Sequence, residues 1–365
     1  MSLVLQHVSK TYNPRSAHPV RAVRDLDLDV PDGDIIALLG SSGCGKTSTL
    51  RMVAGFEDVS EGTITLAGKR IDRLAPARRG VAMAFEGYAL YPPLNVEENI
   101  GFGLAREGGL RRGTDTRKRV HEVADLLEIG PILDRRPAGL SGGQQQRASL
   151  ARALARDADL HLLDEPMGQL EPQLRAVLRG RVKALIKARG LTAVLVTHDQ
   201  TEANAMADRI AVMEGGVLQQ YGPPGELRDR PVNLFVATFL GEPPMNALPA
   251  TVQPGGLRLE DGEGVHLDVP PSALPPVGSK VVFGVRPHRI TLGQGRLHAT
   301  VTSNQWLGDQ AHVAMELGDR LIVAVAHQRV AAAVGSRLDF DFREADAHVF
   351  DAESGRALLH GNQPA

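Results

Sequence analysis

Residues 40–47 read GSSGCGKT and fit G-x-x-x-x-G-K-[ST], the pattern of a loop that wraps around the phosphates of a nucleotide. The short apolar run at 34–39 predicts a buried strand before the loop, and residues 46–52 are typical of the first turns of a helix. Glycines allow a tight turn, and a helix N-terminus favours an anion. The stretch therefore predicts a strand, a phosphate-binding loop and a helix in succession.

The loop supplies most of the candidate nucleotide contacts. Lys46 is expected to reach the β- and γ-phosphates, and the Thr47 hydroxyl is expected to hold Mg²⁺. Cys44 is the single cysteine of the chain and has no partner for an intrachain disulfide, so we interpret it as a small residue that fills the loop. The predicted nucleotide-binding residues of the loop are Gly40, Ser41, Ser42, Gly43, Cys44, Gly45, Lys46, Thr47 and Ser48.

Composition narrows the class of protein. A chain of 365 residues favours two domains, and a net charge of −2 argues against nucleic acid as the main partner. No apolar run approaches the roughly 18 residues of a membrane span. The N-terminus lacks the features of a signal peptide, and the lone cysteine favours a reducing, cytosolic setting.

Strand and helix patterns alternate through the first two thirds of the chain. Apolar runs at 81–85, 160–163 and 192–196 predict buried strands, and helical periodicity covers 116–128 and 170–186. This alternation predicts an α/β fold with a mostly parallel sheet. The region before the loop is β-rich, with predicted half-buried strands at 20–23 and 26–30.

The pattern changes near 242–244, where short strands separated by glycine, proline and aspartate begin and predict a small barrel. We therefore predict one domain over 1–240, with a helical subdomain at about 87–155, and a second domain over 241–365.

Polar residues follow two of the buried strands, where parallel sheets place their ligands. Asp164 suits a Mg²⁺ ligand, and Glu165 suits a base that activates water for attack on a γ-phosphate. His198 follows the next strand and is a candidate γ-phosphate contact, with a structural role as the alternative. The stretch LSGGQQQR at 140–147 places two glycines at the start of a predicted helix, a second anion-binding helix N-terminus.

The LSGGQ stretch, together with the phosphate loop and the Asp-Glu strand end, resembles the signature set of the ABC-transporter ATPases. The stretches at 88–100, 196–203 and 235–248 are similar to the maltose-type subfamily, which takes up carbohydrates. The segment GVRPHRITL at 284–292 resembles the OB-like C-terminal regulatory domain of that subfamily. The implied fold is a P-loop ABC-type nucleotide-binding domain followed by a small all-β, OB-like domain.

The resemblance also implies roles for individual residues, with ATP and Mg²⁺ as cofactors. Tyr12 stacks on adenine, with a surface-turn tyrosine as the alternative. Glu165, His198 and Glu86 form the catalytic set. The signature residues contact a nucleotide that a second subunit holds, which implies a head-to-tail homodimer or a pair with a close relative. The implied metal ligands are Thr47, Glu86 and Asp164, and the signature residues are Ser141, Gly142, Gly143 and Gln144.

Two residues depart from the family pattern. Glu86 stands where the family usually has glutamine, which adds a negative charge beside the γ-phosphate. This glutamate either binds Mg²⁺ more strongly or raises the barrier unless it is protonated. Glu171 replaces the aspartate that usually ends the loop after Glu165, and its extra methylene is expected to loosen the contact across the dimer.

The function implied is the ATP-hydrolysing subunit of an importer for a sugar or a sugar-like polyol. It acts on integral-membrane permease subunits, and indirectly with a solute-binding protein, at the cytoplasmic face of the inner membrane. The permease is expected to dock on residues 86–93 and the helical segment 100–140. The alternative cargoes are glycerol phosphate, a polyamine, iron or sulfate. A non-transport ABC ATPase is disfavoured, because the chain has one phosphate loop, no long heptad run and no basic stripe. For the C-terminal domain, regulation and dimerisation both remain open.

Overall fold

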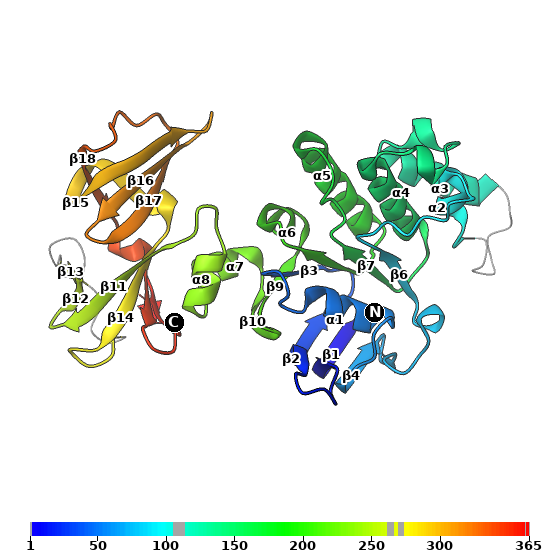
Figure 1. Ribbon diagram of the computed structural model, residues 1–365, viewed down its shortest axis with the longest axis horizontal. Helices are drawn as coiled ribbons and strands as arrows, with labels where there is room; N and C mark the ends of the chain where they lie inside the picture. The colour runs from blue at the N-terminus through cyan, green and yellow to red at the C-terminus, as the bar shows by residue number, and fades with distance from the viewer. Residues whose placement is uncertain (1, 105–113, 261–265, 269–273, 362, 365) are drawn as a thin grey trace. The chain divides into compact units, whose positions relative to one another are not determined.

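The computed structural model describes residues 2–104, 114–260, 266–268, 274–361 and 363–364. These residues form two compact units, Met1–Pro224 and Gly225–Ala365 (Figure 1). None of the described helices is long and apolar enough to span a bilayer.

The N-terminal unit is built around a six-stranded sheet of order β10-β9-β3-β8-β7-β6. The strands from β9 to β6 run parallel, and β10 is antiparallel to β9. Every residue of β3, β7 and β8 is buried, as their unbroken apolar runs predict. The carboxyl ends of these neighbours lie at one edge of the sheet, so the loops after them converge. The strands are β3 (Ile35–Gly40), β6 (Val81–Ala84), β7 (Leu160–Asp164), β8 (Ala193–Thr197), β9 (Arg209–Glu214) and β10 (Val217–Gly222).

An antiparallel sheet of order β2-β1-β4-β5 shares a hydrophobic core with α1 and the parallel sheet. Leu5 of β1, Leu50 of α1 and Leu38 of β3 are fully buried in this core. Burial of each such side chain contributes about 1.5–3 kcal/mol. The core therefore fixes α1, and with it the phosphate loop, between the two sheets. The elements are β1 (Leu3–Tyr12), β2 (Val20–Val30), β4 (Glu61–Leu66), β5 (Lys69–Arg70) and α1 (Lys46–Ala54).

The other helices of this unit lie on the side of the parallel sheet opposite to α1, with α2, α3 and α4 grouped together (Figure 1). Two of them begin with capping boxes, formed by Asn95 and Glu98 on α2 and by Ser141 and Gln144 on α4. The helices are α2 (Val96–Gly101), α3 (Thr114–Leu126), α4 (Gly142–Ala155), α5 (Pro172–Ala188) and α6 (Gln200–Met206).

The C-terminal unit begins with two short helices and continues as two antiparallel sheets of orders β13-β12-β11-β14-β19-β20-β21 and β17-β16-β15-β18. Phe283, Met315 and Phe340 pack in one core between these sheets. The elements are α7 (Pro224–Asp229), α8 (Leu234–Phe239), β11 (Asn246–Gln253), β12 (Gly256–Leu259), β13 (His266–Asp268), β14 (Lys280–Val285), β15 (Ile290–Trp306), β16 (Ala311–Leu317), β17 (Arg320–Ala326), β18 (Arg337–Phe342), β19 (Ala347–Asp351), β20 (Ala357–His360) and β21 (Gln363–Pro364).

Two local predictions differ from the structure. The strands predicted at 20–23 and 26–30 form one continuous strand, β2, which pairs with β1 through several register shifts. The helix predicted to run to Glu128 ends at Leu126, because Glu128 has a left-handed φ of 55° that an α-helix cannot continue.

Candidate functional site

The phosphate loop joins β3 to α1 and depends on glycine. Gly45 has a φ of 103°, and a Cβ there would overlap the carbonyl oxygen of Ala22. Helix α1 begins directly after Gly45 with no side-chain cap on its N-terminus. The N–H groups of its first turn are therefore not satisfied by a cap and are suited to bind an anion.

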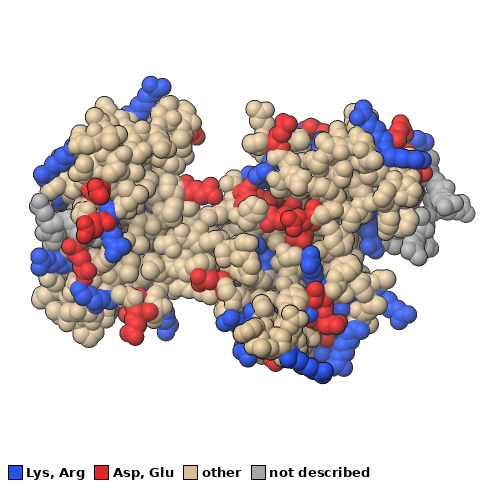
Figure 2. Space-filling view, viewed as in Figure 1, with Lys and Arg blue, Asp and Glu red and all other residues tan. Residues whose placement is uncertain are grey.

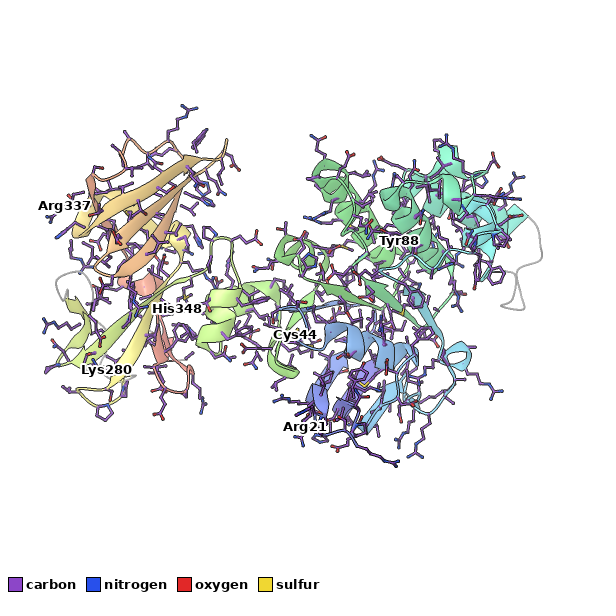
Figure 3. The ribbon with its side chains drawn as sticks, viewed as in Figure 1. Arg21, Cys44, Tyr88, Lys280, Arg337 and His348 are labelled. Carbon is purple, nitrogen blue, oxygen red and sulfur yellow. The ribbon has the colours of Figure 1, made fainter. Side chains whose placement is uncertain are left out.

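Lys46 lies inside the loop. Its Nζ donates to the carbonyl oxygens of Gly40 at 2.8 Å and Ser41 at 2.9 Å, and the residue is buried. Cys44 is buried next to it, with Sγ at 3.6 Å from Nζ (Figure 3). The loop is thus folded around its lysine side chain.

The ends of β7 and β8 bring three predicted site residues together. Asp164 pairs in register with Val196, and the Glu165 amide donates to the Val196 carbonyl at 2.9 Å. Glu165 has a left-handed φ of 47°, a conformation that non-glycine residues rarely adopt. Its Oε1 accepts a hydrogen bond from Nδ1 of His198 at 2.9 Å.

Asp164 is the most perturbed group of the site. It is 3% exposed, and its Oδ1 is buried without a hydrogen-bond partner among the described residues. Burial, and then the charges of Glu86 and Glu165, raise its pKa from 3.8 to about 6. A buried carboxylate oxygen without a partner, beside two more carboxylates, fits a hard cation such as Mg²⁺.

The burial of Asp164 near two other carboxylates predicts that Asp164→Asn changes the free energy of unfolding of the nucleotide-free protein by an amount that depends on pH. A carboxyl group whose folded-state pKa is raised favours folding fully below about pH 4, and this contribution is lost as the pH rises through 6. We expect Asp164→Asn to stabilise the protein at pH 8 by on the order of 2 kcal/mol, and by about half as much at pH 5, which lies between the unfolded and folded pKa values.

Thermal unfolding in the absence of Mg²⁺, at both pH values, measures this gap between the variant and the wild type. Glu202, whose pKa burial raises to about 7, titrates in both proteins and cancels in the comparison. An equal gap at pH 5 and pH 8 would show that the Asp164 charge is not the cause.

Tyr12 lies beside the phosphate loop. Its hydroxyl is 3.2 Å from Oγ of Ser48 on α1, and Nζ of Lys10 lies 4.8 Å from the centre of its ring. The structure therefore brings this tyrosine, predicted to stack on adenine, to the helix that carries the loop.

The signature residues begin α4. Ser141 is exposed, and it exchanges two hydrogen bonds with Gln144 in the first turn of the helix. Gln146 was not among the site residues predicted from the sequence. Its Nε2 donates to the Glu165 carbonyl at 2.8 Å, and its Oε1 accepts from the Gln169 amide at 3.0 Å. Gln146 thus holds the strained Glu165 backbone, and its only sequence signal was the run of three glutamines.

The segment after β6 is also held by α4. Glu86 is exposed, and Arg152 of α4 donates to the carbonyl oxygens of Tyr88 and Ala89 (Figure 3 labels Tyr88). Both of these residues have positive φ angles. Glu171 is exposed and precedes α5 without making a side-chain cap.

A groove of about 670 Å³ opens between this segment and α1. Phe56 and Phe85 lie at its wall with ring centres 5.3 Å apart, and Tyr91 and Phe102 lie 4.5 Å apart. Phe56, Tyr91 and Phe102 are 54%, 43% and 38% exposed, which is unusual for large apolar side chains grouped together.

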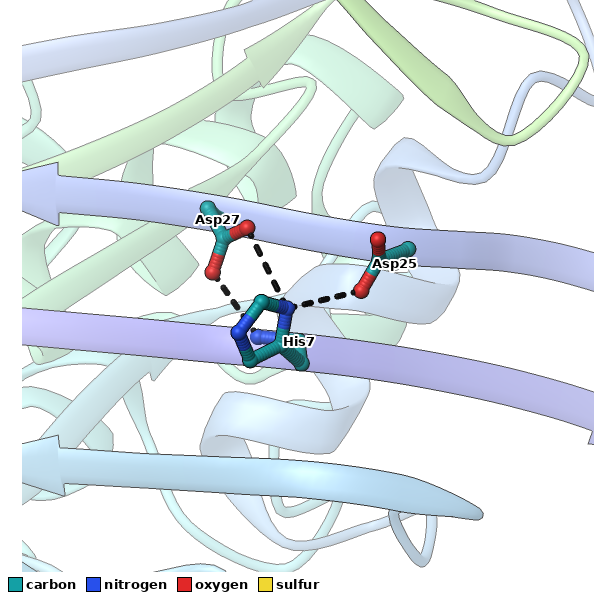
Figure 4. A group of neighbouring side chains, drawn as sticks. All are labelled: His7, Asp25 and Asp27. Atoms are coloured by element: carbon teal, nitrogen blue, oxygen red, sulfur yellow. Dashed lines mark hydrogen bonds and ion pairs between the residues drawn. The ribbon is translucent and has the colours of Figure 1, made fainter.

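An exposed histidine and two aspartates gather on the antiparallel sheet (Figure 4). Nδ1 of His7 lies 2.9 Å from Oδ1 of Asp25 and 3.5 Å from Oδ2 of Asp27. The hydrogen bond to Asp25, and then the charge of Asp27, raise the pKa of His7. All three side chains are solvent-exposed, so we interpret the group as a surface ion pair.

Comparison with known proteins identifies the family. Residues 23–168 match the ABC transporter family, residues 241–290 the MalK OB fold domain and residues 283–350 the TOBE domain. The sn-glycerol-3-phosphate import ATP-binding protein UgpC of Ruegeria sp. is 39% identical over 98% of this chain and 99% of its own length. The chain belongs to the ABC transporter ATP-binding proteins.

Relatives with other named cargoes are equally similar. The xylose/arabinose import ATP-binding protein XacK of Haloferax volcanii is 39% identical, covering 100% of this chain and 97% of its own length. The trehalose import ATP-binding protein SugC of Mycobacterium tuberculosis is 39% identical, covering 98% of each. The predicted membership of the maltose-type importer branch is confirmed, and so is the ATPase fold with its OB-like C-terminal domain.

Solved structures agree with this assignment. The ATP-binding cassette MJ0796, in a dimeric post-hydrolysis state bound to ADP and Pi, superposes with a TM-score of 0.56 at 27% identity, over 60% of this chain and 98% of its own. The chain is thus an ABC-type ATPase.

On the face shown in Figure 2, acidic and basic side chains are interspersed, consistent with the net charge of −2.

Proposed function

We propose that this ATPase powers the import of a sugar or a sugar-like polyol. It works as a nucleotide-sandwich homodimer, or as a pair with a close relative, at the cytoplasmic face of the inner membrane. The observation that carries the proposal is the convergence of Asp164, Glu165 and His198 beside the phosphate loop, in a chain similar over its full length to import ATP-binding proteins.

Lys46 and Glu165 act within one half-site. When nucleotide enters, the Lys46 ammonium group exchanges its two carbonyl partners for phosphate oxygens. Glu165 takes a proton from the attacking water, and His198, which hydrogen-bonds Glu165, contacts the γ-phosphate. Thr47, Glu86 and Asp164 would hold Mg²⁺, which supplies charge neutralisation on the phosphates. Tyr12 stacks on the adenine.

The other half of each nucleotide site comes from a second subunit. Ser141 is exposed at the N-terminus of α4. Gly142 and Gly143 follow it, and because they have no side chains, a ligand can approach the backbone of this helix start closely. An exposed helix N-terminus can bind the γ-phosphate of a nucleotide held by a facing copy. Loss of the γ-phosphate then removes the bridge, and the dimer opens.

The aromatic groove lined by Phe56, Phe85, Tyr91 and Phe102 is proposed to receive an apolar segment of the integral-membrane permease. Arg152 lies over the Tyr91 ring at 5.5 Å and also binds the backbone after Glu86. One arginine therefore contacts both the groove and the segment after β6 that carries Glu86. A change at Glu86 on nucleotide binding can in this way be transmitted to the permease.

We expect Phe56→Asp to reduce permease binding and transport at least tenfold, because a buried unpaired charge would replace an aromatic anchor. The measurement is recovery of the permease with the tagged ATPase from detergent-solubilised membranes. Leu321→Asp, at a 64% exposed apolar residue of the C-terminal unit, is the matched control. Full recovery of the permease with Phe56→Asp would place the docking surface elsewhere.

The cargo is tested through the solute-binding protein of the complex. The intact membrane complex is isolated, the binding protein is identified by mass spectrometry, and its thermal shift is measured with trehalose, xylose, arabinose and glycerol 3-phosphate. A shift with a neutral sugar or polyol supports the proposal. Spermidine, ferric iron and sulfate are titrated in parallel. A shift only with one of these three, or only with glycerol 3-phosphate, would favour another cargo.

A further inference from the structure

A cavity of about 240 Å³ within the C-terminal unit is rich in basic side chains. It lies where α7, the segment after β14 and the ends of β19 and β20 meet, near His348 in Figure 3. Four arginines and two aspartates line it. They are Arg228, Arg230, Arg286, Arg289, Asp229 and Asp346.

Arg286 is the buried centre of this cavity. It is 5% exposed, and its guanidinium donates to the carbonyl oxygens of Arg228, Ala237 and Leu240, the shortest at 2.6 Å. Its hydrogen-bond partners among the described residues are carbonyl groups, which carry only partial negative charge. Burial, and then the charge of Arg228, lower its pKa to about 10. A buried charge of this kind is normally balanced by an opposite charge.

The two aspartates already serve other partners. Asp229 pairs with Arg228 at 2.9 Å, and Asp346 pairs with Arg289 at 3.5 Å and with Arg343 at 2.7 Å. Among the described residues, neither carboxylate forms an ion pair with Arg286. The positive charge at the centre of the cavity therefore has no directly paired carboxylate in the part of the chain that the structure describes, and Asp229 balances it only from a distance.

Three histidines complete the lining. Nδ1 of His348 lies 2.9 Å from Nδ1 of His360, so one ring donates to the other. Burial lowers the pKa of each to about 4, and burial also lowers the pKa of His288. All three are neutral at pH 7, where an imidazole can both donate and accept hydrogen bonds. The arginines supply the charge, and the histidines add polar groups.

We propose that this cavity binds a small dianionic metabolite, a phosphate or a dicarboxylate, between Arg228, Arg286 and Arg289. The guanidinium fork matches both kinds of oxyanion. A volume of about 240 Å³ is below the roughly 300–1,000 Å³ of sites for drug-sized ligands and suits a small ligand. Such a ligand would place a negative charge in direct contact with Arg286, whose hydrogen-bond partners are carbonyl groups. The inference is independent of the transported cargo.

The test is calorimetric titration of the full-length protein with inorganic phosphate and, separately, with succinate at constant ionic strength. Both are titrated into a Lys46→Ala background, which weakens phosphate binding at the loop of residues 40–47. We expect saturable binding with a Kd below about 1 mM for at least one of the two anions. Binding of phosphate alone, or of succinate alone, supports the proposal and identifies the class of ligand.

The cavity variant is Arg228→Gln combined with Arg289→Gln, whose wild-type side chains are 58% and 43% exposed, so both changes are compatible with folding. We expect it to weaken binding at least about tenfold, because charge-assisted hydrogen bonds are lost. Arg296→Gln, a 45% exposed arginine of the same unit that pairs with Asp341, is the control. No saturable binding of either anion, or equal binding by the cavity variant and the control, would overturn the proposal.

Discussion

Replacement of Glu165 by glutamine is expected to lower ATP hydrolysis at least about 100-fold while leaving ATP binding intact, because an amide cannot take a proton from water. Glutamine keeps the size of the side chain and can still contact His198, which now lies 2.9 Å from the carboxylate. The backbone contacts of Glu165 to Val196 and Gln146 are unchanged by the substitution. The measurement is steady-state phosphate release at saturating MgATP.

Glu97→Gln is the matched control, because Glu97 is also partly buried and also pairs with a histidine, His121 at 3.3 Å. It lies on α2, away from the phosphate loop, and we expect its rate to stay within about twofold of the wild type. Wild-type turnover by Glu165→Gln would remove this residue from the role of base.

The second large effect is expected when two inactive variants are mixed, because each nucleotide site is proposed to contain residues from two chains. We expect Ser141→Arg and Lys46→Ala each to abolish hydrolysis in isolation, and an equal mixture of the two to recover activity. In a mixed dimer one site combines an intact phosphate loop with an intact signature, and half of the dimers are mixed. Independent sites then give about one quarter of the wild-type rate.

A mixture of Lys46→Ala with Glu165→Gln is the control for this experiment. Both residues lie in the same half-site, since the charges of Lys46 and Glu165 act on the pKa of Asp164 within one chain. No mixed dimer then contains an intact site, and no recovery is expected. Absence of recovery in the Ser141→Arg and Lys46→Ala mixture at every ratio would contradict a site shared between chains.

The sequence predicted those parts of the site that depend on local patterns. The phosphate loop, the strand that ends at Asp164 and the helix that begins after Ser141 each carry their own glycine, apolar or capping signal. The order of β3, β8 and β7 in the sheet then follows from pairing that joins distant segments. This pairing brings His198 to Glu165, which the chain order alone does not show.

Features that depend on contacts between side chains distant in the chain could not be predicted from the sequence. Gln146 contacts the Glu165 carbonyl, 19 residues away, and nothing separates it in the sequence from the neighbouring glutamines. The raised pKa of Asp164 needs both its burial and the position of Glu86. In the C-terminal unit, the basic cavity joins residues of α7, β19 and β20, which no local motif connects.

The mass of the ATP-bound Glu165→Gln protein tests most directly whether two chains share each nucleotide site. One chain has a mass of 39.1 kDa, and native mass spectrometry resolves the number of chains and of bound nucleotides. The account predicts a dimer with two ATP molecules that forms with ATP and separates with ADP. A protein that remains a single chain with ATP, while the wild type hydrolyses ATP at its full rate as a monomer, would contradict it.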